Sequence, residues 1–144
     1  MKKLMMATAA TALMAGTAFA GGHAKDVKIG IILGFTGPIE SISPAMASAA
    51  ELAMKEVNDA GGILSGDMVV PVRADSTCID AAAAQAAAER LITADKVKAL
   101  VGADCSGVTT AILNNVAKAN GVVMVSPSAT SPALSTIEDG GLFF

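Results

Sequence analysis

The sequence predicts an α/β protein with three layers, α-β-α, around a central parallel sheet, and three observations lead to this prediction. Short apolar runs, often β-branched, alternate along the chain with longer segments whose apolar residues follow helical spacing. Glycine and proline mark most of the connections between them. The chain has 144 residues, 53% of them hydrophobic, which is enough for one domain with a core. Strict alternation with short connections favours parallel strands joined by right-handed crossovers.

The first strand and the first helix are predicted in residues 27–60. Residues 27–33 are almost continuously apolar, as in a strand buried on both faces, and a turn-rich loop follows at 34–38. A helix is expected to begin at Ser43-Pro44 and to stop at Gly61-Gly62. Its polar face carries Glu51, Lys55 and Asn58, and its expected buried face consists of Ile42, Ala45, Met46, Ala49, Leu52, Ala53 and Val57.

The remaining elements follow in the same alternation. Pro71 places the second strand near a sheet edge, because proline cannot donate to the ladder. Asp80 is a plausible N-cap for an alanine-rich helix, and Gly121 is expected to end the third helix. The predicted elements are strands at 68–75, 98–101, 122–125 and 141–144, helices at 81–93 and 106–120, and a turn of helix at 132–135.

The first 20 residues have the pattern of a secretory signal peptide. Lys2 and Lys3 form a short positive region, residues 4–15 are apolar, and Ala18-Phe19-Ala20 is a small-x-small cleavage site. The apolar run is too short to span a membrane. We therefore expect cleavage after Ala20 and a mature protein in an oxidising exterior compartment, most simply a bacterial periplasm.

Charge and motifs argue against several classes of function. The formal net charge of −3 gives no basis for binding nucleic acid or an anionic membrane. The sequence has no Walker A loop and no G-x-G-x-x-G after the first strand. His23 is the only histidine, near the expected mature N-terminus, and the residues around Ser106 do not form G-x-S-x-G. We expect no cofactor, no metal and no enzymatic activity.

The chain has two cysteines, Cys78 and Cys105, which is an even count in a protein predicted to be exported. They are too far apart for a C-x-x-C redox motif, and a metal site would need more ligands. A structural disulfide is therefore the leading interpretation. It would tether the loop at 76–80 to the turn that contains Ser106.

Three loops are expected to form a common rim, because the carboxyl ends of parallel strands meet at one edge of a sheet. These loops, at 34–44, 102–107 and 126–132, are rich in glycine, serine, threonine and proline and poor in charge. Such a rim can hydrogen-bond a small polar ligand. Serine and threonine also cap helices and stabilise turns, which explains each hydroxyl equally well when it is taken alone. The hydroxyls are those of Ser106, Ser128 and Thr130, and the backbone near Gly107 and Ala129 adds N–H and C=O groups.

The turn at 102–107 is the part of the rim best suited to an anion. It runs from a strand into a helix, where the first backbone N–H groups lack intrahelical partners and the helix dipole favours negative charge. Ser106 adds a hydroxyl at that point, so we expect it to hold a carboxylate. Asp104 is interpreted as a charge at the start of this helix.

Four motifs occur together along the chain. Gly34-Phe35-Thr36-Gly37-Pro38 follows the first strand, the first helix ends in a segment at 56–63, Cys105-Ser106 follows the third strand, and residues 126–130 follow the fourth. This combination resembles the leucine/isoleucine/valine-binding type of periplasmic binding protein, the receptor of branched-chain amino-acid ABC transporters. The resemblance covers essentially all of the chain after the leader.

The resemblance implies two α/β lobes that close on a ligand by a hinge motion, with this chain as the first lobe of a type I periplasmic binding protein. It implies that Ser106 binds the α-carboxylate through its hydroxyl and N–H. Thr130 would contact carboxylate and ammonium, and the Ser128 carbonyl would accept from the ammonium, with Ala129 in the same ligand-binding loop. Cys78 and Cys105 would match the disulfide of the family.

Two departures from the family pattern limit what the resemblance implies. Ile42 stands where family members often place an aromatic residue on the ligand. Family members are also more than twice as long, so residues 21–144 are interpreted as an N-terminal ligand-binding lobe whose second lobe is absent. The partners implied for the full-length protein, a monomer, are an amino acid or small amide and a membrane permease.

Two other functions use the same fold. A sensory or regulatory module could bind a small amide or amino acid without transport, and a neighbouring permease gene or a downstream signalling domain would separate the two. An exported α/β enzyme would need a base for a serine nucleophile, and the sequence offers none near Ser106.

Overall fold

Four parallel strands form the centre of the fold. A computed structural model describes residues 25–64 and 66–144, and the predicted leader and His23 lie outside the described residues. The strands pair in the order β2-β1-β3-β4, so the edge position predicted for Pro71 is confirmed. Their bounds are β1 (Val27–Leu33), β2 (Val69–Asp75), β3 (Ala99–Gly102) and β4 (Val123–Val125).

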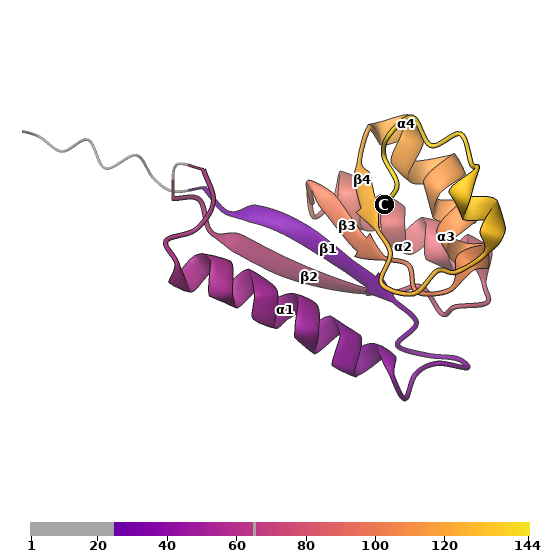
Figure 1. Cartoon of the computed structure of the whole chain (residues 1–144), viewed down its shortest axis with the longest axis horizontal. Helices are drawn as coiled ribbons and strands as arrows, with labels where there is room; N and C mark the ends of the chain where they lie inside the picture. The colour runs from indigo at the N-terminus through magenta and orange to yellow at the C-terminus, as the bar shows by residue number, and fades with distance from the viewer. Residues whose placement is uncertain (1–24, 65) are drawn as a thin grey trace, which may run out of the picture.

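Helices cover both faces of this sheet, which confirms the three predicted layers. In Figure 1, α1 (Ser43–Asp59) runs beside β1 and β2, while α2 (Ala81–Thr93) and α3 (Ser106–Ile112) lie on the other side. Alternate residues of β1 point to the two layers. Ile32 packs in a core with α2 and α3, and Ile31 and Leu33 pack in a smaller core with α1. Within residues 25–64 and 66–144, no helix has the length and apolar character required to cross a bilayer.

The helix ends follow the sequence signals. The Asp80 carboxylate accepts from the N–H groups of Ala82 and Ala83, so the predicted N-cap of α2 is confirmed. Gly121 adopts φ +63° and ends the third helix as predicted. That helix is continuous from 106 to 120, but its middle is a π turn that was not predicted. Its parts are α3, η1 (Leu113–Ala117) and α4 (Lys118–Asn120), and a 3-10 turn, η2 (Pro132–Ser135), follows later.

The predicted fifth strand is present as a short parallel pairing beside β4. The N–H of Met124 donates to the Leu142 carbonyl at 2.7 Å, and the N–H of Phe144 donates back to the Met124 carbonyl at 3.0 Å. Figure 1 shows the C-terminus next to β4. Residues 142–144 therefore extend the sheet on this side.

The buried face predicted for α1 is wrong except at Met46, which packs against the smaller core. The helix buries Ser43, Ala47 and Met54, whereas Ile42 is 55% exposed and Leu52 56% exposed. This helix is rich in alanine and carries small residues on all of its faces, so the periodicity of the sequence defines its apolar stripe poorly. Its rotation follows polar contacts instead, because the Ser43 hydroxyl bonds a buried carboxylate at one end and the Asn58 amide bonds both backbone groups of Val69 at the other.

Candidate functional site

The loops after β3 and β4 are joined by serine side chains at the carboxyl ends of the strands. The Ser126 hydroxyl donates to the Ala103 carbonyl at 2.6 Å, and the Ser128 hydroxyl donates to the Asp104 carbonyl at 2.9 Å. The Ser106 hydroxyl oxygen accepts from the N–H of Ser131 at 3.0 Å. These contacts place the loops at 102–107 and 126–132 side by side, as predicted. Sequence reasoning did not single out Ser126 and Ser131, whose bonds bring the two loops together.

Ser106 is half-buried and its proton is available to a ligand. Its oxygen already accepts one hydrogen bond, and no acceptor for its hydroxyl proton is found among residues 25–64 and 66–144. The first N–H of the helix with a partner is that of Thr109, which donates to the Cys105 carbonyl at 3.0 Å. The N–H groups of residues 106–108 precede it. This turn therefore presents a hydroxyl donor and adjacent backbone donors, the set required to hold a carboxylate.

The other three predicted residues lie on the neighbouring loop and differ in exposure and in hydrogen bonding. Ser128 and Thr130 are exposed, and Ala129 is half-buried. The Ala129 N–H already donates to the Ser126 hydroxyl at 2.9 Å, and the Ser128 hydroxyl is engaged with Asp104. Among the described residues, the groups left for a ligand are therefore the Thr130 hydroxyl and the carbonyl oxygens of residues 128–130.

The loop between β1 and α1 is held by the carboxylate of Asp75 at the end of β2. Asp75 accepts from the N–H of Phe35 at 3.0 Å, the N–H of Thr36 at 3.3 Å, the hydroxyl of Thr36 at 2.6 Å and the N–H of Thr77 at 2.8 Å. Burial alone would raise the pKa of Asp75, but hydrogen bonds from the Thr36 hydroxyl and from the N–H groups of Thr77, Thr36 and Phe35 outweigh it. Together they lower the pKa below its ordinary value of 3.8.

Asp75 should make the stability of the chain depend on pH in acid. Because its folded-state pKa is depressed, its contribution is fully present above its unfolded pKa and is lost as pH falls through the folded value. We expect the difference in free energy of unfolding between the wild type and Asp75→Asn to be constant from pH 7 to about 5 and to shrink below that. Urea unfolding at a series of pH values measures this difference. Asp26→Asn is the control for loss of one exposed carboxylate, and a difference that stays constant to about pH 2 would contradict the assignment.

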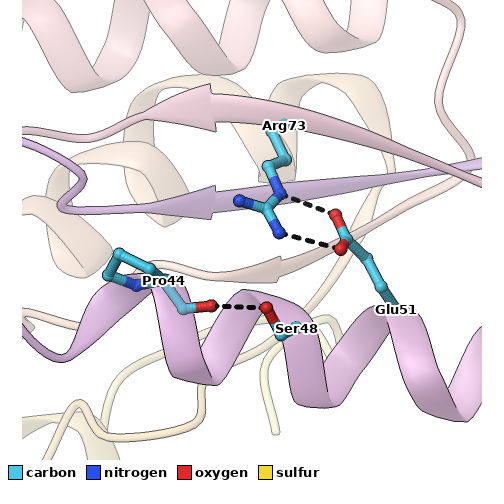
Figure 2. Close-up of polar contacts among 4 residues, drawn as sticks. All are labelled: Pro44, Ser48, Glu51 and Arg73. Carbon is cyan, nitrogen blue, oxygen red and sulfur yellow. Dashed lines mark hydrogen bonds and ion pairs between the residues drawn. The ribbon is translucent and has the colours of Figure 1, made fainter.

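Arg73 supports the same loop from β2. Figure 2 shows its guanidinium facing the Glu51 carboxylate of α1, with nitrogen–oxygen distances of 2.6 and 2.8 Å. The same guanidinium carbon lies 5.5 Å from the centre of the Phe35 ring. The hydrogen bond from Arg73 lowers the pKa of Glu51, despite partial desolvation. The pair therefore fixes α1 against β2 next to the start of the loop.

The predicted disulfide between Cys78 and Cys105 is confirmed. The two Cα atoms are 5.2 Å apart and the cysteines are separated by 27 positions in sequence. The bond joins the loop after β2 to the residue that precedes Ser106. The loop after β2 is thus joined covalently to the turn after β3, which serine hydrogen bonds join to the loop after β4.

An apolar groove of about 250 Å³ lies elsewhere, between α1 and the sheet. It contains none of the rim residues, and its walls offer no polar group that could hold a zwitterion. We therefore place the candidate site at the rim and not in this groove. Its lining residues are Ala50, Ala53, Met54, Val57, Ile63, Val69 and Val101.

Comparison with protein families gives one match over most of the chain. Residues 26–142 match the family model described as "Periplasmic binding protein". This range contains all four strands and every rim residue.

Curated relatives and solved structures agree with this match. A Leu/Ile/Val-binding protein of Rhizobium johnstonii is 34% identical over 132 residues, covering 92% of this chain and 35% of that protein. A leucine-specific-binding protein of Salmonella typhimurium is 32% identical, covering 80% of this chain and 30% of that protein. A branched-chain amino acid transporter substrate binding protein of Streptococcus pneumoniae, solved in complex with isoleucine, is similar with TM-score 0.74 and 34% identity, covering 83% of this chain and 33% of that one. This chain thus spans about a third of the length of the relatives it matches.

Proposed function

Because this chain belongs to the periplasmic binding protein family, we propose that it forms the first lobe of a receptor that captures an amino acid for an ABC importer. The ligand is a branched-chain amino acid or a related small amide. The observation that carries this proposal is the half-buried Ser106 hydroxyl. Among the described residues, neither its proton nor the N–H groups of residues 106–108 have a hydrogen-bond acceptor. Two relatives support it, since they are named as a Leu/Ile/Val-binding protein and a leucine-specific-binding protein.

The rim offers complementary groups to the two ends of a zwitterion. In the proposal, the α-carboxylate accepts from the Ser106 hydroxyl and from backbone N–H groups at 106–108. The ammonium donates to the Ser128 carbonyl, which accepts no backbone hydrogen bond among the described residues. Thr130 contacts both ends through its exposed hydroxyl, and Ala129 completes the loop beside them. All of these interactions are non-covalent, so the proposed protein binds and releases its ligand without a chemical reaction.

Ile42 supplies an apolar surface at the same rim. It lies at the N-cap of α1 with 55% of its surface exposed, on the loop that Asp75 holds in place. In the proposal its side chain packs against the branched side chain of the ligand, which would remove apolar surface of both from water. Family members often have an aromatic residue at this position. Isoleucine is smaller and leaves more room for the ligand side chain, so in the proposal this position limits the size of the ligand.

The proposed receptor works in the periplasm, after the leader at 1–20 has been removed. Its relatives are about three times as long as the part matched by this chain. We assign the other half of the ligand cleft to a second lobe, which would close over residues 106 and 128–130. The complete receptor is proposed to be a monomer that delivers the amino acid to a membrane permease.

Isothermal titration calorimetry on the complete product of the gene tests the proposal. The protein is refolded to remove bound ligand and then titrated with leucine, isoleucine, valine and a panel of small amides. We expect one of these to bind. Ser106→Ala should weaken binding roughly 10- to 100-fold, because a hydrogen bond to a charged group contributes about 1.5–3 kcal/mol.

Ser48→Ala is the matched control for this substitution. Ser48 is exposed on α1 and its hydroxyl donates to the carbonyl of Pro44 in its own helix, at 2.9 Å (Figure 2). Its loss should leave the dissociation constant unchanged. The absence of binding to any amino acid or amide, or equal effects of the two alanine variants, would count against the proposed site.

A further inference from the structure

Asp104 is a buried carboxylate at the centre of the rim, and its interpretation as a charge at the helix start is wrong. Only 3% of the residue is exposed. Within residues 25–64 and 66–144, no lysine or arginine forms an ion pair with it. Its carboxylate oxygens accept hydrogen bonds instead, from the Gly34 N–H at 2.8 Å, the Ser43 hydroxyl at 2.9 Å and the Ser76 hydroxyl at 3.4 Å. Ser43 and Ser76 are themselves fully buried.

These contacts connect every loop at the carboxyl edge of the sheet. Gly34 begins the loop between β1 and α1, Ser43 is the first residue of α1, and Ser76 follows β2. Asp104 itself belongs to the turn after β3, and its main-chain carbonyl accepts from Ser128 on the loop after β4. We infer that Asp104 is a positioning residue that holds the four loops in the arrangement required for ligand binding.

The effect of Asp104 on ligand affinity follows from which segments its contacts hold together. Ser106 lies two residues after Asp104, and Ile42 lies one residue before Ser43, so the carboxylate holds two proposed ligand-contacting segments together. A ligand binds only the fraction of molecules in which both segments are in place, and the apparent dissociation constant rises as this fraction falls.

The chain offers a matched control at the other end of the same helix. The Asn58 amide exchanges two hydrogen bonds of 2.8 Å with the backbone of Val69, so it anchors α1 to the start of β2. Asn58→Ala therefore removes a polar anchor of α1 as Asp104→Ala does, but at the edge of the sheet opposite the rim. A purely structural role of Asp104 predicts equal effects of the two variants on binding.

The experiment measures two quantities on the complete gene product. The first is the dissociation constant for the amino acid that binds the wild type, and the second is hydrogen–deuterium exchange of the segment 34–43. For Asp104→Ala we expect a dissociation constant raised about tenfold and exchange of this segment accelerated to a similar extent. Asn58→Ala should lower stability but change neither quantity by more than about twofold.

Asp104→Asn tests the geometry separately from the charge. Its amide oxygen can accept from Gly34 and Ser43, while its NH₂ group can donate to the Ser76 hydroxyl. It should therefore restore the affinity to within about threefold of the wild type and restore slow exchange in the segment 34–43. If Asp104→Ala does not fold, Ser43→Ala removes one arm of the contact and should still raise the dissociation constant about threefold.

Three results would overturn the inference. They are unchanged affinity and exchange in Asp104→Ala and Ser43→Ala, an equal loss of affinity in Asn58→Ala, or an Asp104→Asn variant as impaired as the alanine variant. Because this role rests on the proposed function, the two must be separable. If the wild type binds no amino acid or amide, the proposed function fails, and the exchange measurement alone decides whether Asp104 holds the loops.

Discussion

Replacing Gly102 with alanine is expected to lower the free energy of unfolding by roughly 4 kcal/mol or more. Gly102 ends β3 opposite Ile32 of β1 and has φ +128°, a conformation that residues with a side chain rarely adopt. A Cβ atom there would lie 2.0 Å from the main-chain oxygen of Ile32. Since that atom belongs to the backbone, no change of rotamer relieves the overlap, and the two central strands would have to separate.

Chemical denaturation followed by circular dichroism measures this effect. Gly107→Ala is the control, because Gly107 is exposed on α3 and a Cβ atom there meets nothing within 4 Å. Alanine also favours the helix, so the control should be neutral or slightly stabilising. A Gly102→Ala protein as stable as the control would contradict this prediction, because it would show that β1 and β3 can move apart without lowering the free energy of unfolding.

Removing the disulfide has the second largest expected effect. The double variant Cys78→Ser/Cys105→Ser should lose roughly 3–4 kcal/mol of stability, because opening a loop of this length frees the unfolded chain. The bond also holds an unusual loop, since Thr77 and Cys78 have φ of +57° and +70°, which non-glycine residues seldom adopt. We therefore expect residues 76–80 to lose order first when the bond is absent.

Thermal unfolding with and without reductant measures this loss. A reductant should lower the melting temperature of the wild type to that of the double variant and leave the variant unaffected. Free-thiol labelling of the wild type purified without reductant should find no reactive cysteine before reduction. Two reactive thiols in the native protein would contradict the bond.

Local signals in the sequence predicted the elements of the fold well. Alternation of strands and helices, Asp80 as a cap, Gly121 as a stop and Pro71 at an edge depend on neighbouring residues only, and the structure confirms each of them. The rim followed from the rule that the carboxyl ends of parallel strands meet. Two cysteines in a chain predicted to be exported left a disulfide as the leading interpretation.

Contacts between distant residues account for what sequence reasoning missed. The Ser43 hydroxyl meets Asp104 across 61 positions, and no local pattern marks either as buried. A serine at the start of a helix is usually a cap, and an aspartate before a helix is usually solvated. The rotation of α1 and the burial of Asp104 were missed together, because one buried hydrogen bond joins Ser43 to Asp104.

The outer edge of the sheet has a consequence for how the protein behaves at high concentration. Among the residues that the structure describes, β2 has a strand on one side only, and it carries Pro71 and the ion-paired Arg73. A strand from another molecule would lose one donor at the proline and would have to accommodate a charged side chain. This edge is thus a poor template for aggregation, while β4 on the opposite side is capped by residues 142–144 of the same chain.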